Sequence, residues 1–150
     1  MKLKASPLGE NTENGVRMNV VTFGTFDCFH IGHLNIFKRI KNEYPECRLI
    51  VGVSTDELNF SKKERMPIVL FEQRVEIVSS IIYVDEIFPE ESLEKKRDYL
   101  IKCNADVLVM GDDHKGVYDS LNDICKIWYL PRTPQISTTA IIERIIAEND

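Results

Sequence analysis

Short apolar runs alternate with amphipathic stretches along most of the chain. The β-branched run 19–23 predicts a buried strand, and the stretch 31–44, with apolar residues at helical spacing, predicts a helix. The pattern then repeats: it predicts further strands at 48–53, 85–88, 107–110 and 127–130, and further helices at 71–82, 92–103 and 137–147. The charged segment 54–67 is expected to be a loop that closes over a bound ligand.

Strands that alternate with helices indicate a single-domain α/β fold, with a parallel sheet and helices on both of its faces. In such sheets, ligands bind beyond the carboxyl ends of the strands. Three segments with polar candidate residues follow predicted strands: Gly24–His33, Gly111–His114 and Arg132–Thr139. We therefore expect the functional site to be built from these three segments.

Composition narrows the class of protein. A chain of 150 residues with 43% hydrophobic and 29% charged residues fits one soluble globular domain. The net charge of -5 argues against a nucleic-acid-binding surface, and no apolar run is long enough to cross a bilayer. The four cysteines lack metal-ligand spacing, and no signal peptide opens the chain, so reduced thiols in the cytoplasm are expected. Residues 1–17 are polar and predict a disordered extension, which leaves 18–150 as the folded domain.

Two of the three histidines lie together after the first strand. His30 and His33 are three residues apart at the start of a predicted helix, and so on one face of it. The first turn of that helix offers unpaired N–H groups and a partial positive charge, and Gly32 lets a phosphate approach the backbone. A single histidine here would usually be a cap or a solvated residue, but two around a glycine favour an anion site. A metal site of Asp27, His30 and His33 is an alternative, although zinc normally needs further ligands.

The segment 131–139 is the second informative motif. Arg132 follows a predicted strand, where its planar guanidinium can grip a phosphate. Ser137, Thr138 and Thr139 supply hydroxyl and N–H groups at another helix start. A plain helix N-cap is the alternative for these hydroxyl residues.

Together these motifs resemble a known family. The sequence His30-Ile31-Gly32-His33 resembles the HxGH signature of a nucleotidyltransferase superfamily with a Rossmann-like fold, and the preceding Thr25-Phe26-Asp27 resembles its cytidylyltransferases. The C-terminal motif is similar to the Arg-Thr-x-x-Ile-Ser-Thr-Thr signature of the same family. The resemblance covers 19–145 and is strongest to small bacterial members that use glycerol phosphate; it includes Val53–Glu57, Tyr83–Glu86 and Val109–Asp113.

This resemblance implies the reaction and its partners. A cytidylyltransferase of this kind would transfer CMP from CTP to glycerol phosphate, giving CDP-glycerol for teichoic-acid-type or capsular polymers, and pyrophosphate. It implies a homodimer, and Mg²⁺ that enters with CTP and has no dedicated protein ligands. It also implies site roles, which we state as predictions. Catalytic roles fall on His30, His33, Lys62 and Arg132; nucleotide binding on Thr25, Phe26, Gly32, Asp112, Arg132, Ser137 and Thr138; and acceptor binding on Asp27, Arg74 and His114.

Two departures from the family pattern concern the acceptor. Ile82 stands where the glycerol-phosphate members usually have Arg, and His114 stands where they usually have Trp. The alternatives are therefore a cytidylyltransferase for choline phosphate, ethanolamine phosphate or a phosphonate, or an adenylyltransferase of the same superfamily. Two alternatives from other functional classes also remain, a non-catalytic nucleotide-binding subunit and a metal-dependent hydrolase.

Overall fold

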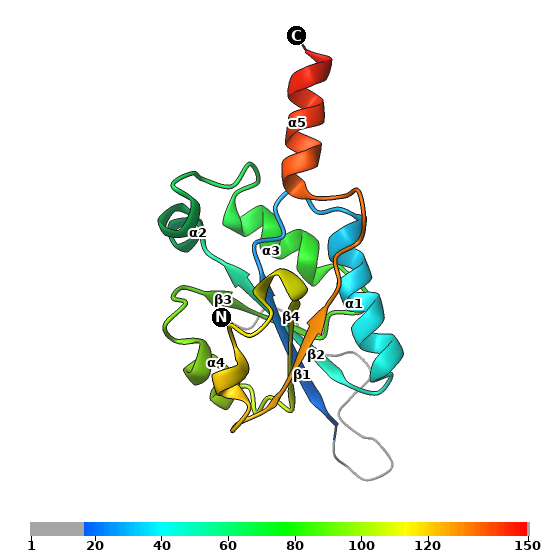
Figure 1. The fold of residues 1–150 in the computed structure, drawn as a ribbon, viewed down its shortest axis with the longest axis vertical. Helices are drawn as coiled ribbons and strands as arrows, with labels where there is room; N and C mark the ends of the chain where they lie inside the picture. Colours follow the sequence, from blue (N-terminus) through cyan, green and yellow to red (C-terminus); the bar gives the residue numbers. More distant parts are fainter. Residues whose placement is uncertain (1–16, 150) are drawn as a thin grey trace.

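Five parallel strands form one sheet in the order β3-β2-β1-β4-β5 (Figure 1). The chain is described here by a computed structural model that covers residues 17–149. The strands are β1 (Asn19–Gly24), β2 (Arg48–Ser54), β3 (Glu86–Glu90), β4 (Val107–Gly111) and β5 (Lys126–Leu130). Because β1 lies in the centre, between β2 and β4, both of its neighbours end beside the loop that carries the histidine motif.

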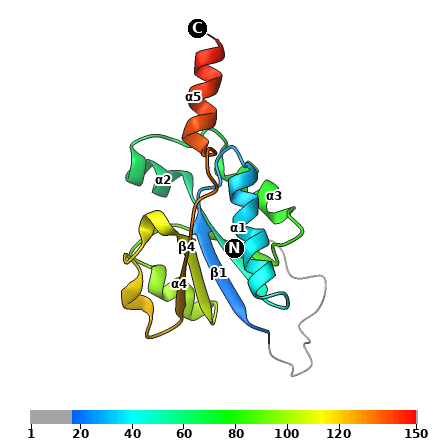
Figure 2. The ribbon, with the colours of Figure 1, turned by 45° about the vertical axis from the view of Figure 1, so that its right-hand side comes forward.

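Helices cover both faces of the sheet, as predicted (Figure 2). One face packs against α1 (Ile31–Glu43) and α3 (Phe71–Ser79), whose buried side chains include Phe37, Ile40 and Val78. The other face packs against α4 (Lys96–Lys102) and a short 3-10 helix, η2 (Asp119–Leu121). A second 3-10 helix, η1 (Asp112–His114), directly follows β4 and has no buried residue. These two apolar clusters form the core, since every strand contributes to one or both of them.

The last helix does not join either layer. α5 (Thr138–Glu148) projects from the end of the domain above the carboxyl ends of the strands (Figures 1 and 2). Ser137 is its N-cap and accepts a hydrogen bond from the Ala140 N–H at 3.0 Å, which agrees with the predicted helix start. None of its residues is buried. No helix in the described part of the chain has the length and apolarity needed to cross a bilayer.

The main correction to the predicted elements is α2 (Asp56–Lys63), which lies within the expected loop. Thr55 caps this helix by accepting from the Leu58 N–H at 3.2 Å, with acidic residues in the first turn and lysines in the last. Only Leu58 and Asn59 are buried, so the helix has too few apolar positions to show the usual periodicity. Element boundaries also differ by a few residues, most of all at α3, which ends at Ser79, and at α4, which begins at Lys96.

Arg17 belongs to the folded domain and not to the extension in which the sequence placed it. Its guanidinium donates to the Cys47 carbonyl at 3.0 Å and lies 3.8 Å from the Asp85 carboxylate. Residues 1–16, the rest of the predicted disordered extension, lie outside the described residues.

Candidate active site

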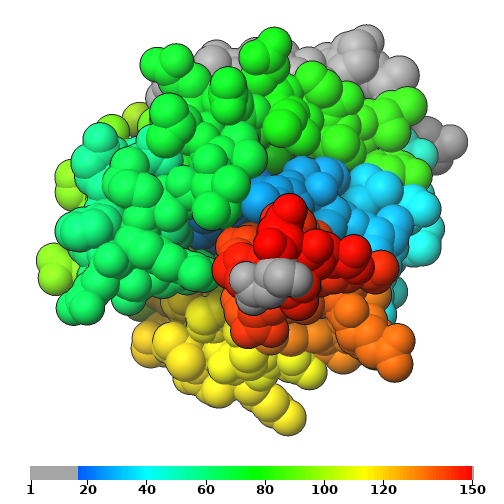
Figure 3. Space-filling view, turned by 90° about the horizontal axis from the view of Figure 1, so that it is seen from above, coloured from blue at the N-terminus to red at the C-terminus, as the bar shows by residue number. Residues whose placement is uncertain are grey.

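A cavity of about 530 Å³ lies at the carboxyl ends of the strands. This volume is typical of small-molecule sites. It joins the three segments that the sequence singled out, and α5, α2 and the residues after β4 surround its opening (Figure 3). Its lining is basic although the chain is acidic. Six cationic and three acidic side chains line the cavity. The cations are Arg39, Lys62, Lys63, Arg65, Lys96 and Arg132, and the acids are Asp27, Glu90 and Asp113.

His30 and His33 form a stacked pair at the start of α1. Their ring centroids are 3.8 Å apart, with 23° between the planes. The Nδ1 atom of His30 accepts from the Gly32 N–H at 3.0 Å, and the Nδ1 atom of His33 accepts from the His30 N–H at 3.2 Å. Because both Nδ1 atoms are acceptors, a neutral ring must carry its proton on Nε2. Both histidines are therefore held as Nε2–H donors.

The surroundings of the two rings keep them neutral. Burial lowers the pKa of His33 to about 3, and the neighbouring His30 adds to the decrease. Burial also lowers the pKa of His30 below its ordinary value. Two neutral rings can stack without charge repulsion, and each still donates one hydrogen bond.

This low pKa predicts a pH effect on stability. Unfolded His33 titrates near pH 6.5, so below that pH the unfolded chain binds a proton that the folded chain refuses. The stability contributed by neutral His33 is complete above pH 6.5 and is lost as the pH falls toward 3. Between pH 6.5 and 5 the wild type should lose about 2 kcal/mol more than His33→Asn, which cannot titrate. Urea unfolding of both proteins at the two pH values tests this, and equal losses would contradict it.

Two glycines and a phenylalanine hold the histidines in place. Phe26 has a left-handed backbone (φ 57°), and its buried ring packs edge-on to His33 with centroids 5.3 Å apart. A Cβ atom at Gly24 would lie 2.9 Å from the Phe26 ring, and one at Gly32 would lie 2.8 Å from the His30 ring. Gly24 thus provides space for this ring, since its own backbone has no positive φ. A phenylalanine in a left-handed conformation is uncommon and is typical of functional loops.

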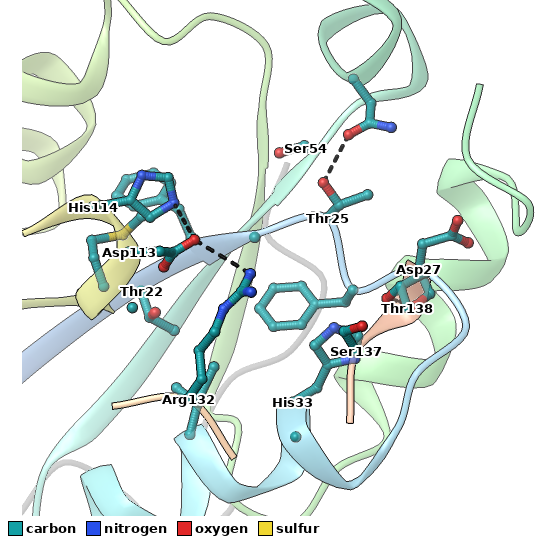
Figure 4. A pocket seen from close by; sticks show the side chains of 18 of the residues that line it. Thr22, Thr25, Asp27, His33, Ser54, Asp113, His114, Arg132, Ser137 and Thr138 are labelled. Carbon is teal, nitrogen blue, oxygen red and sulfur yellow. Dashed lines mark hydrogen bonds and ion pairs between the residues drawn. The ribbon is translucent and has the colours of Figure 1, made fainter. Parts of the chain in front are cut away.

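The C-terminal motif completes the histidine side of the cavity. Thr138 Oγ1 donates to the Asp27 carbonyl at 2.9 Å and lies 3.4 Å from His30 Nε2. Arg132 is exposed and lines the cavity, and its Nη2 lies 3.3 Å from the Asp113 carboxylate (Figure 4). The two motifs, more than 100 residues apart in sequence, therefore form one polar surface, as the sequence predicted.

A second polar group lines the cavity at the ends of β2 and β3. The Lys62 ammonium donates to Ser54 Oγ at 3.3 Å, and Ser54 Oγ donates to the Glu90 carboxylate at 3.1 Å. Although much of the Lys62 side chain is exposed, burial of its ammonium lowers its pKa. Thr25 Oγ1 donates to Asn59 Oδ1 at 2.8 Å, which ties the histidine loop to α2.

Most of the predicted site residues line the cavity, and two do not. Those that do are Thr25, Phe26, Asp27, His30, Gly32, His33, Lys62, His114, Arg132, Ser137 and Thr138. Asp112 is exposed outside the cavity, and it is the next residue, Asp113, that lines the wall and pairs with Arg132. His114 remains a candidate for acceptor binding, with its Nε2 3.7 Å from Asp113.

The buried position of Arg74 contradicts its predicted role in acceptor binding. Its side chain is fully buried and does not reach the cavity. The guanidinium donates to the carbonyls of Thr25, Ser54 and Val69 and to the Asp56 carboxylate, at 2.7 to 2.8 Å. Arg74 therefore joins the histidine loop to the end of β2 and positions the site from behind.

Asp27 lies at the cavity wall, but its carboxylate is already engaged. Its two oxygens accept from the Ile68 and Val69 N–H groups, each at 2.8 Å. This contact anchors the segment after α2 and does not support the predicted acceptor contact. It also argues against the alternative metal site with His30 and His33, whose Nδ1 atoms both accept from backbone N–H groups. Within residues 17–149, no three His, Cys, Asp or Glu side chains cluster as metal ligands would.

The sequence reasoning missed several lining residues, namely Ser54, Asn59, Glu90, Lys96 and Asp113. A signal existed for two of them. Ser54 directly follows the predicted strand 48–53, and Asp113 lies in the segment Gly111–His114, which follows another predicted strand. Glu90 and Lys96 gave no comparable signal, because their role depends on contacts across the sheet.

Comparison with known proteins identifies the family. Residues 21–144 match the family described as cytidylyltransferase-like. The chain belongs to this family. The glycerol-3-phosphate cytidylyltransferase of Bacillus subtilis is 45% identical over 84% of this chain and 95% of its own length. The enzyme of the same name from Staphylococcus aureus is 39% identical over 87% of this chain and 96% of its own length.

A solved structure supports the same fold. The lipopolysaccharide core biosynthesis protein from Thermoplasma volcanium superposes with a TM-score of 0.64 over 77% of this chain and 96% of that chain. The two sequences are only 21% identical, so the comparison concerns the fold alone. The family match and the two relatives show that this chain is a nucleotidyltransferase. The solved structure shows a similar fold.

Proposed function

We propose that this protein transfers CMP from CTP to glycerol 3-phosphate, producing CDP-glycerol and pyrophosphate. One observation carries the proposal: His30 and His33 are fixed as neutral Nε2–H donors in a basic cavity, with Thr138 beside them. The near-full-length similarity to glycerol-3-phosphate cytidylyltransferases supports the choice of substrates.

The reaction is an in-line displacement at the α-phosphorus of CTP. A phosphate oxygen of the acceptor forms the new P–O bond, and the bond from the α-phosphorus to the bridging oxygen of pyrophosphate breaks. The acceptor oxygen is an anion at neutral pH, so no strong general base is required. Catalysis then consists of positioning and of stabilising charge on the phosphate oxygens.

Each part of the cavity supplies one element of this stabilisation. The Nε2–H groups of His30 and His33 donate to phosphate oxygens as negative charge develops. The N-terminal N–H groups of α1 and α5 add their partial positive charge. Lys62 and Arg132 neutralise the triphosphate and the departing pyrophosphate, and Ser137 and Thr138 complete the cradle.

Three further features belong to the proposal. The described residues offer no dedicated metal site, so Mg²⁺ would enter bound to the phosphates of CTP, and no step is assigned to it. The protein would act in the cytoplasm as a homodimer. Its CDP-glycerol would serve reactions that transfer glycerol phosphate to teichoic-acid-type or capsular polymers.

An acceptor screen tests the proposed function directly. The purified protein is incubated with CTP, Mg²⁺ and glycerol 3-phosphate, choline phosphate or ethanolamine phosphate, and phosphorus NMR follows the products. We expect CDP-glycerol and pyrophosphate in equal amounts, and much slower turnover of the other acceptors. A parallel reaction with ATP and FMN tests for an adenylyltransferase. CTP binding without pyrophosphate release would favour a non-catalytic subunit, and zinc-dependent release of inorganic phosphate would favour a hydrolase.

A further inference from the structure

A buried ion pair lines the cavity on the side away from the histidines. Lys96, the first residue of α4, has an exposed fraction of only 6%, and Glu90, at the end of β3, has 1%. The Lys96 ammonium lies 2.6 Å from a Glu90 oxygen, and both residues border the cavity. Removing a lysine and a glutamate from water is costly, so a pair kept at a cavity wall needs a further explanation.

The Lys96 ammonium also lies over two aromatic rings. Its Nζ is 3.9 Å from the centroid of the Phe23 ring and 5.2 Å from that of Tyr118. Faces of this kind bind quaternary ammonium groups when they are free. Here the protein's own cation fills that space.

Lys96 and Glu90 differ in how many hydrogen bonds they can still form. One Glu90 oxygen accepts from Lys96, and the other accepts from Ser54 Oγ. The ammonium has three N–H donors, and Glu90 is its one hydrogen-bond partner in the described part of the chain. Lys96 can therefore donate to a ligand without leaving Glu90, whereas both Glu90 oxygens are already used.

The position of Lys96 fits the acceptor. The histidines lie at the start of α1, which packs on one face of the sheet, and Lys96 belongs to α4, which packs on the other. The cavity passes over the carboxyl ends of the strands and connects the two faces of the sheet. In an in-line displacement the attacking and leaving oxygens lie on opposite sides of the phosphorus. With the α-phosphate of CTP held at His30 and His33, an acceptor bound at Lys96 approaches the phosphorus from the other face of the sheet.

We infer that Lys96 binds the acceptor, donating to oxygen atoms of an anionic phospho-alcohol with an uncharged head group, and that it excludes acceptors with a cationic head group. This inference rests on the proposed function and adds the residue that selects the acceptor. Choline phosphate is disfavoured because its quaternary ammonium would meet the Lys96 cation in the space beside Phe23 and Tyr118.

Lys96→Met tests the inference, since it keeps the length of the side chain and removes the charge. Loss of one charge-assisted hydrogen bond corresponds to about a 10- to 100-fold higher KM for glycerol 3-phosphate. The Kd for CTP, measured by calorimetry without acceptor, should change less than about twofold. Lys95→Met is the matched control, because Lys95 is the adjacent lysine, is exposed and does not border the cavity.

The selectivity of the variant provides the second measurement. In Lys96→Met the ratio of kcat/KM for glycerol 3-phosphate to that for choline phosphate should fall at least about tenfold. If Lys96→Met does not fold because Glu90 is left unpaired, the double variant Glu90→Gln/Lys96→Met removes both charges and is measured in the same way. An unchanged acceptor KM and an unchanged ratio in a folded variant would overturn the inference alone. A wild type that does not use glycerol 3-phosphate would overturn the proposed function, and the inference with it.

Discussion

Replacing His33 with asparagine is expected to lower kcat by about 10²–10³ and to leave the fold intact. The asparagine amide oxygen can still accept from the His30 N–H, as Nδ1 of His33 does at 3.2 Å. It has no donor at the position of Nε2, so one preorganised donor to the developing charge is lost. Removal of such a donor typically costs about 2.7–4 kcal/mol of transition-state stabilisation.

The His33→Asn prediction is checked by steady-state kinetics and circular dichroism. Lys38→Ala is the control, because Lys38 is an exposed residue of the same helix and does not border the cavity. Its kcat should stay within about twofold of the wild type. If folded His33→Asn retained the wild-type kcat, His33 would have only a capping role, and the proposed mechanism would lose its main donor.

Arg74→Met is expected to destabilise the protein by about 3–5 kcal/mol, the range for breaking a buried ion pair by removing one partner. The variant leaves the carbonyls of Thr25 and Ser54 without their donor, and the Asp56 carboxylate without its cation. Because the Arg74 side chain is fully buried, its position is not in contact with bulk water. Urea unfolding at pH 7.5 measures the loss.

Arg97→Met provides the matched comparison for Arg74. Arg97 also pairs with a carboxylate, that of Asp123 at 2.9 Å, but both side chains are substantially exposed. Exposed ion pairs contribute little to stability, so this variant should remain close to wild-type stability. If Arg74→Met were as stable as the wild type and only raised the acceptor KM, the acceptor role predicted from the sequence would stand, and the positioning role would be wrong.

Local sequence was sufficient for most of the fold. The buried strands are short apolar runs and α1 has a clear apolar stripe, so each could be predicted from residues close together in the chain. The histidine motif was equally local, because both rings are oriented by backbone N–H groups within three residues. The helix α2 shows where this approach fails, since its cap and charge pattern carry the signal that apolar spacing lacks.

What the sequence determined by itself was the parallel α/β fold, the histidine motif and the C-terminal hydroxyl residues as parts of one site. Only the tertiary structure decided that Arg74 is a buried support, that Asp113 and not Asp112 faces the cavity, and that Lys96 borders it beside Glu90. The physical reason is the range of the interactions. Capping and apolar periodicity act over a few residues, whereas Arg74 meets Thr25 across 49 positions and Ser54 meets Glu90 across 36, once neighbouring strands end at the same edge of the sheet.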